Sequence, residues 1–95
     1  MNVEFLRREN GPERLESEAE IIFTEGALQG MKLVGFCVWR GADGAHYVTF
    51  PSRALGSGTE RRFFDYIRSA AGNIEDCRRL KDWILNEYQA SKLGK

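Results

Sequence analysis

The alternation of apolar and polar residues predicts an antiparallel hairpin near the N-terminus. Over residues 15–21 every second residue is apolar or small, and the residues between are Glu16, Glu18 and Glu20. This period of two predicts a strand with one buried face and one solvated, acidic face. A preceding strand is expected over residues 2–8, and the Asn-Gly and Pro signals that separate the two predict a turn.

Residues 31–39 are apolar on both alternating sets, which predicts a central strand covered on both faces. A second subunit can cover one of these two faces. The Asp-Gly pair within residues 41–44 predicts a tight turn, and the next strand, residues 45–50, should end at Pro51. A Gly-Ser-Gly loop follows, and the aromatic-rich residues 61–67 indicate a further strand, with a helix as the alternative. The first two thirds of the chain therefore predict a meander of about five strands.

The period changes at Asn73, where spacings of three and four predict a helix of about four turns. Asn73 is expected to cap its N-terminus. The apolar stripe expected to face the sheet consists of Ile74, Cys77, Leu80, Trp83, Ile84 and Tyr88. The expected outer face carries Arg78, Arg79, Asp82, Asn86 and Gln89.

Length and composition favour one small domain over residues 1–95. A chain of 95 residues buries a limited share of its surface, so we expect a homodimer to add stability. The formal net charge of zero gives no global attraction to nucleic acid or membrane, but the charged residues are unevenly distributed along the chain. Residues 1–30 hold three Arg and seven Glu, a balance of minus four, and residues 31–95 hold eleven basic and seven acidic residues, a balance of plus four. Any attraction to a polyanion must therefore be local.

The chain lacks the residues that several classes of function require. Two cysteines and one histidine make neither a disulfide framework nor a four-ligand zinc site, so we expect no metal or other cofactor and a cytoplasmic protein. No apolar run approaches the roughly 18 residues of a membrane span, and we expect no membrane partner. Cys37 and Cys77 are expected in the interior, and His46 is expected to be a structural or an exposed histidine. Without a nucleophile and base, a metal set or a carboxylate pair, we expect no enzymatic activity.

The candidate binding residues surround the Gly-rich loop. Ser52, Arg53, Arg61 and Arg62 combine hydroxyl and guanidinium groups that bind phosphate oxygens, and a neighbouring aromatic ring can stack on an unpaired base. The loop lacks the Gly-Lys-Ser/Thr ending of a nucleotide-binding P-loop. The alternative is a mobile hairpin tip with ordinary surface arginines and core phenylalanines.

The order of these segments resembles the SpoVG family of small bacterial regulators. The resemblance spans nearly the whole chain, and its most telling residues are Pro51-Ser52-Arg53 and Leu85-Asn86-Glu87-Tyr88. It implies an α+β fold with a curved antiparallel sheet and a C-terminal helix, assembled as a homodimer that binds DNA and RNA without catalysis.

The binding residues of that family match this chain only in part. The family's Pro-Ser motif precedes two basic residues, which are Arg53 and Ala54 here, and its basic helix start is matched by Arg79, whereas Cys77 departs from the pattern. Arg78 shares the exposed face of Arg79. The alternative function is a dimeric protein-interaction module that binds no nucleic acid.

Overall fold

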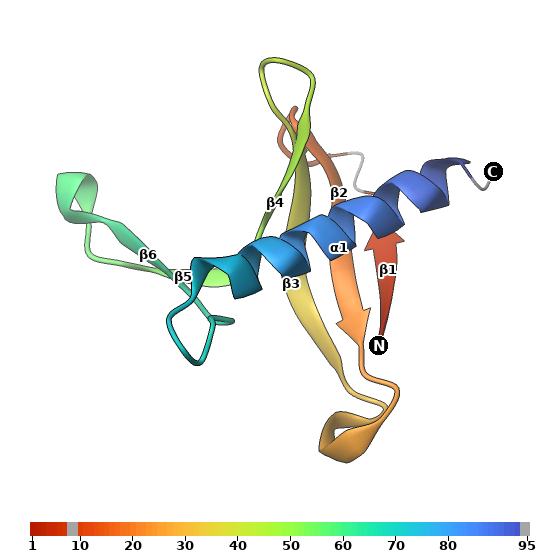
Figure 1. Cartoon of the computed structure of the whole chain (residues 1–95). Helices are drawn as coiled ribbons and strands as arrows, with labels where there is room; N and C mark the ends of the chain where they lie inside the picture. The colour runs from red at the N-terminus through yellow and green to blue at the C-terminus, as the bar shows by residue number, and fades with distance from the viewer. Residues whose placement is uncertain (8–9, 94–95) are drawn as a thin grey trace.

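The N-terminal half of the chain forms a four-stranded antiparallel sheet (Figure 1) in the computed structural model, which describes residues 1–7 and 10–93. The strands follow one another across the sheet as β1 (Asn2–Leu6), β2 (Leu15–Ile22), β3 (Lys32–Arg40) and β4 (His46–Thr49). The predicted N-terminal hairpin, the central position of β3 and the turn before β4 are confirmed. The predicted first strand extends to Arg8, which lies outside the described residues.

Glu16 lies in a β-bulge of β2 and not in the predicted row of solvated glutamates. Its neighbours Leu15 and Ser17 pair with two adjacent residues of β3, so Glu16 has no partner of its own on that strand. Its Oε1 atom is 3.0 Å from Nε2 of His46 on β4. The prediction is wrong for Glu16 because the inserted residue breaks the period-two alternation of side chains.

A second irregularity in the pairing of β2 with β3 occurs at Gly35. Two paired positions on β2 are separated by two residues in the sequence, whereas their partners on β3 are separated by three. The extra residue is therefore on β3. Gly35 has a φ of +102°, and a Cβ atom at this position would lie only 2.9 Å from Cβ of Pro51. Glycine therefore permits both the bulge and the close approach of Pro51, the residue that precedes the next hairpin.

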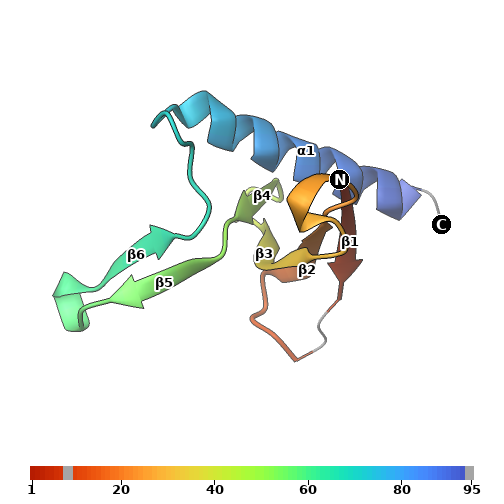
Figure 2. The same ribbon diagram turned by 90° about the horizontal axis from the view of Figure 1, so that it is seen from below.

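The helix α1 (Ile74–Leu93) packs across one face of the four-stranded sheet (Figures 1 and 2). Asn73 caps it as predicted, because its Oδ1 accepts a hydrogen bond from the backbone N–H of Glu75 at 3.0 Å. Ile74, predicted to face the sheet, is 70% exposed because the first turn extends beyond β4 in both views. The buried core between helix and sheet consists of Ala19, Ile21, Phe36, Val38, Val48, Phe50, Ile84 and Tyr88.

The outer face of α1 is polar, as predicted. Its side chains Arg78, Arg79, Asp82, Asn86 and Gln89 are all exposed. Within the described residues, no helix combines the length and the apolar character that a membrane crossing requires.

The chain leaves the main sheet after Pro51 and forms a separate hairpin of β5 (Ser52–Leu55) and β6 (Arg62–Asp65). The predicted single meander of about five strands is therefore wrong in this part, and the described strands divide into sheets of four and two. Pro51 lacks a backbone N–H, while its carbonyl accepts a hydrogen bond from the backbone N–H of Tyr66 at 2.8 Å. The hairpin begins there and extends away from the main sheet (Figure 1).

Among residues 1–7 and 10–93, no helix covers the outer face of the four-stranded sheet. Trp39 and Tyr47 lie opposite each other on this face, and Tyr47 is 48% exposed. The expected cover on both faces of β3 is thus absent within the described residues of a single chain, because one helix covers only one face. Cys37 and Cys77 are each half-buried and not interior as predicted. Burial raises the pKa of the Cys37 thiol, and the charge of Glu18 acts in the same direction.

Candidate nucleic-acid interface

Four of the predicted binding residues lie on the β5–β6 hairpin, where the register divides them between two faces. Arg53 lies opposite Phe64 and Leu55 opposite Arg62, and residues directly opposite in an antiparallel pair share a face. We call this the Phe64 face; its members are Arg53, Leu55, Arg62 and Phe64. The reverse side is the Phe63 face; its members are Ser52, Ala54, Phe63 and Asp65.

The hairpin presents its arginines and its aromatic rings to solvent. Every residue of β5 and β6 is exposed, including Phe63 at 67% and Phe64 at 40%. Among the described residues, no carboxylate lies within ion-pair distance of Arg53, Arg61 or Arg62. These three guanidinium groups therefore retain their full capacity to bind an anion in bidentate geometry.

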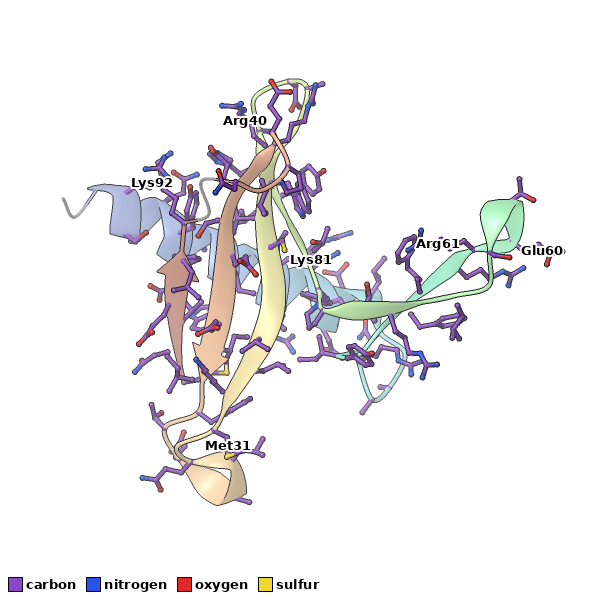
Figure 3. The ribbon with its side chains drawn as sticks, turned by 180° about the vertical axis from the view of Figure 1, so that it is seen from behind. Met31, Arg40, Glu60, Arg61, Lys81 and Lys92 are labelled. Atoms are coloured by element: carbon purple, nitrogen blue, oxygen red, sulfur yellow. The ribbon has the colours of Figure 1, made fainter. Side chains whose placement is uncertain are left out.

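Arg61 stands near the tip of the hairpin, together with Glu60 (Figure 3). Its guanidinium carbon lies 5.3 Å from the centre of the Phe63 ring, which is a cation–π geometry. Gly56 begins the tip with a φ of +84°, and a Cβ atom there would lie 2.7 Å from the carbonyl oxygen of Glu60. The tight return of the chain at this point requires glycine, and it places Arg61 directly before β6.

The other two predicted residues, Arg78 and Arg79, lie in the first turns of α1 and form ion pairs within the helix. Arg78 Nη1 is 2.9 Å from Glu75 Oε1, and Arg79 Nη2 is 3.0 Å from Asp76 Oδ1. A hydrogen bond from the Ser69 hydroxyl lowers the pKa of Asp76, and the bond from Arg79 lowers it further. Exposed pairs of this kind contribute little energy and can exchange for another anion.

The hairpin and the helix start do not form one continuous strip. In Figure 2 the tip of the hairpin lies far from the first turn of α1, although the segment after β6 leads into the helix. A groove of about 470 Å³ lies along that segment and the first half of α1, and both Arg68 and Arg79 line it. Its apolar lining includes Phe50, Ile67, Cys77, Leu80 and Trp83. The structure thus distributes the predicted cations over two elements.

Three exposed aromatic side chains lie beside the predicted binding residues without being among them. The alternative interpretation of Phe63 and Phe64 as core residues is wrong, and Tyr66, at 65% exposure, was not among the candidates. The signal is present in the sequence: in residues 62–65 the alternation puts one charged and one aromatic residue on each face. Neither face of such a strand is apolar enough to be buried against a core.

Of the two alternatives expected for His46, structural or exposed, the structure shows the structural one. Its Nε2 atom lies 3.0 Å from Glu16 Oε1 and its Nδ1 atom 3.2 Å from Gln89 Nε2. The ring also meets Tyr88 edge-on, at 5.6 Å between the ring centres. In the part of the chain that the structure describes, no three His, Cys, Asp or Glu side chains are grouped to hold a metal ion.

The arrangement of the free cations suits an extended anion better than a small enclosed one. Arg53, Arg61 and Arg62 follow a projecting hairpin and are exposed, whereas the groove beside α1 is mainly apolar. Comparison of the chain with protein-family models, with curated proteins and with solved structures finds no match in any of the three.

Proposed function

We propose that this protein is a homodimeric nucleic-acid-binding regulator of the SpoVG type. Its phosphate contacts are made by Arg53, Arg61 and Arg62 on the hairpin, with Ser52 beside them. The observation that carries the proposal is the projecting hairpin with three exposed guanidinium groups that have no ion-pair partner among the described residues. Arg78 and Arg79 form a second contact at the start of α1 after they exchange their helix carboxylates for phosphates.

The physical support is the match between the hairpin and a polyanion. Contacts from arginine and hydroxyl groups to phosphate oxygens position a protein on nucleic acid without reading its sequence. A two-stranded ribbon is narrow enough to enter a major groove or to lie along a single strand. The near-zero net charge limits long-range attraction, so we expect affinity to come from these local contacts.

Salt-dependent binding to labelled single-stranded DNA, duplex DNA and RNA tests this function. If phosphates are neutralised, the logarithm of the affinity falls with the logarithm of the salt concentration, with a slope near 0.9 per duplex phosphate and about 0.7 per single-strand phosphate. The triple variant Arg53→Ala, Arg61→Ala, Arg62→Ala should lower the affinity at low salt. It should also reduce the magnitude of this slope by about two to three, slightly less than one for each phosphate contact that is lost.

Arg40→Ala is the matched control, because Arg40 lies on the main sheet, well apart from the hairpin (Figure 3). It should leave the affinity and its salt slope nearly unchanged. If the parent protein binds none of the three nucleic acids at about 50 mM salt, where phosphate-mediated binding is strong, the proposal is wrong. The same holds if the triple variant is folded and binds as the parent does.

The second candidate is a dimeric protein-interaction module without nucleic-acid binding. Ala54, in the place of a second cation, and the exposed apolar side chains Leu55, Phe63 and Phe64 favour it. A folded parent protein that fails to bind any nucleic acid but self-associates through a measurable equilibrium would favour this module.

A further inference from the structure

The β5–β6 hairpin lacks a packing partner within the described residues. A two-stranded hairpin alone is at best marginally stable in water, and all eight residues of β5 and β6 are exposed. Exposed aromatic side chains at Phe63, Phe64 and Tyr66 add to this apolar surface. We therefore expect the hairpin to gain order from an external partner, and its two faces offer that partner different chemistry.

The Phe64 face alternates cations with aromatic rings. Along β6, Arg62 and Phe64 point to this side, and the hydrogen bond from the backbone N–H of Tyr66 to the Pro51 carbonyl continues the pairing beyond the strand. Tyr66 follows β6 directly and is 65% exposed, so its ring lies beside the end of this face. Arg53 lies opposite Phe64, so that ring has one guanidinium across the hairpin and another two residues earlier.

Carboxylates distinguish the two faces. Asp65 lies on the Phe63 face, opposite Ser52, whereas no member of the Phe64 face is acidic. A phosphate chain on the Phe64 face therefore meets two arginines without a neighbouring negative side chain. On the Phe63 face, Arg61 already covers one side of the Phe63 ring.

We infer that the Phe64 face binds single-stranded nucleic acid, with unpaired bases stacked on Phe64 and Tyr66 and neighbouring phosphates bound by Arg53 and Arg62. The inference rests on the proposed function and names the form of nucleic acid that the hairpin takes. Bases inside a duplex are already stacked on each other, so only unpaired bases expose the ring faces that these side chains need. A surface that alternates cations with aromatic rings therefore binds a single strand better than a duplex.

A second copy of the same face is a poor occupant. Two-fold pairing of the Phe64 face with itself would bring together Arg53 and Arg62 from both chains, four guanidinium groups with no carboxylate on that face. Like charges placed directly opposite are destabilising. A polyanion with flat apolar bases complements both the charge and the rings.

The two adjacent phenylalanines provide a matched test. Phe64→Ala and Phe63→Ala remove the same ring from opposite faces of one strand, and neither residue belongs to the buried core. Fluorescence anisotropy would measure the binding of each variant and of the parent to labelled oligothymidylate, to an abasic strand of equal length and to a duplex of equal length. Circular dichroism and thermal unfolding would verify that both variants keep the parent's fold.

We expect the parent to bind oligothymidylate more tightly than the abasic strand or the duplex. Phe64→Ala should weaken oligothymidylate binding by about 5- to 150-fold, the range that corresponds to one stacked base. Its affinity for the abasic strand should change less than about twofold, because the phosphate contacts of Arg53 and Arg62 remain. Phe63→Ala should bind all three nucleic acids nearly as the parent does.

Different outcomes overturn different parts of the assignment. If the parent binds no nucleic acid, the proposed function and this inference are both wrong. If the parent binds the duplex or the abasic strand as tightly as oligothymidylate and Phe64→Ala has no effect, only the stacking inference is wrong. A loss of oligothymidylate binding in Phe63→Ala but not in Phe64→Ala would overturn the choice of face. A change in the sedimentation mass of Phe64→Ala would identify the Phe64 face as a contact between protein chains.

Discussion

At the scale of single residues, the contact between Glu16 and His46 ties three elements together. His46 on β4 donates from Nε2 to the Glu16 carboxylate on β2, and the Gln89 amide on α1 donates to Nδ1. The hydrogen bond from His46 holds the pKa of Glu16 below its ordinary value. The burial of Tyr88 beside this group raises the pKa of its hydroxyl, and the charge of Glu16 raises it further. The bulge that turns Glu16 toward the helix therefore also creates this link.

This link predicts a stability change in acid. Because the native pKa of Glu16 lies below its ordinary value, the native state binds this proton more weakly than the unfolded state. The stabilisation is complete above about pH 4.3 and is lost as the pH falls through the lowered native pKa. Glu16→Gln should flatten this part of the dependence of the unfolding free energy on pH, measured by urea denaturation. Glu4→Gln, on the exposed side of β1, is the control; equal acid slopes for parent and Glu16→Gln would contradict the prediction.

Gly35 carries a second prediction at this scale. Gly35→Ala would place a side chain at a φ of +102° and 2.9 Å from Cβ of Pro51. We expect a loss of about 1–3 kcal/mol in the free energy of unfolding, measured by urea denaturation, because the backbone is unfavourable for alanine and Pro51 must shift. Gly30→Ala tests conformation alone, since Gly30 has a φ of +86° but open space around it. If Gly35→Ala is no more destabilising than Gly30→Ala, the close approach of Pro51 is energetically unimportant.

At the scale of elements, the β5–β6 hairpin and the main sheet should differ in dynamics. β3 lies between two hydrogen-bonded neighbours beneath α1, whereas β5 and β6 pair only with each other and are exposed throughout. Amide hydrogen exchange should therefore be fast over Ser52–Leu55 and Arg62–Asp65 and slow in the interior of β3. Saturating oligothymidylate should slow exchange in the hairpin and leave the protection of β3 unchanged. Equal protection of β3 and the hairpin in the free protein would show that the hairpin already has a partner.

At the scale of the whole molecule, the uncovered outer face of the main sheet is the surface that we expect to form the homodimer. Trp39 and Tyr47 form a cross-strand pair on it, and Trp39 Nε1–H donates to Thr49 Oγ1 at 2.8 Å. Sedimentation should give about twice the chain mass for the parent. Tyr47→Lys should give the mass of one chain, because like charges would then face each other across a two-fold interface. Leu28→Lys, an exposed residue between β2 and β3, should remain dimeric; a monomeric parent would contradict the expectation.

Much of the fold follows from local patterns. The alternation over residues 15–21, the Asp-Gly turn after β3 and the three-and-four spacing after Asn73 each predict an element that the structure contains. These signals survive because side-chain direction repeats every two residues in a strand and every 3.6 in a helix. The predicted site is likewise recognisable: the arginines that surround the Gly-rich loop do lie on one hairpin. The division of the hairpin residues between two faces could be derived only from the register of β5 against β6.

The sequence by itself determined the order of the elements, the cap at Asn73 and the exposure of the helix arginines, because each depends on neighbours a few residues away. Only the tertiary structure decided that Glu16 faces His46, that β5 and β6 leave the main sheet and that Phe63 and Phe64 lie on opposite exposed faces. A bulge depends on how two strands pair, and the place of a hairpin depends on the close approach of Pro51 to Gly35. Such contacts join residues far apart in the chain, and no local period encodes them.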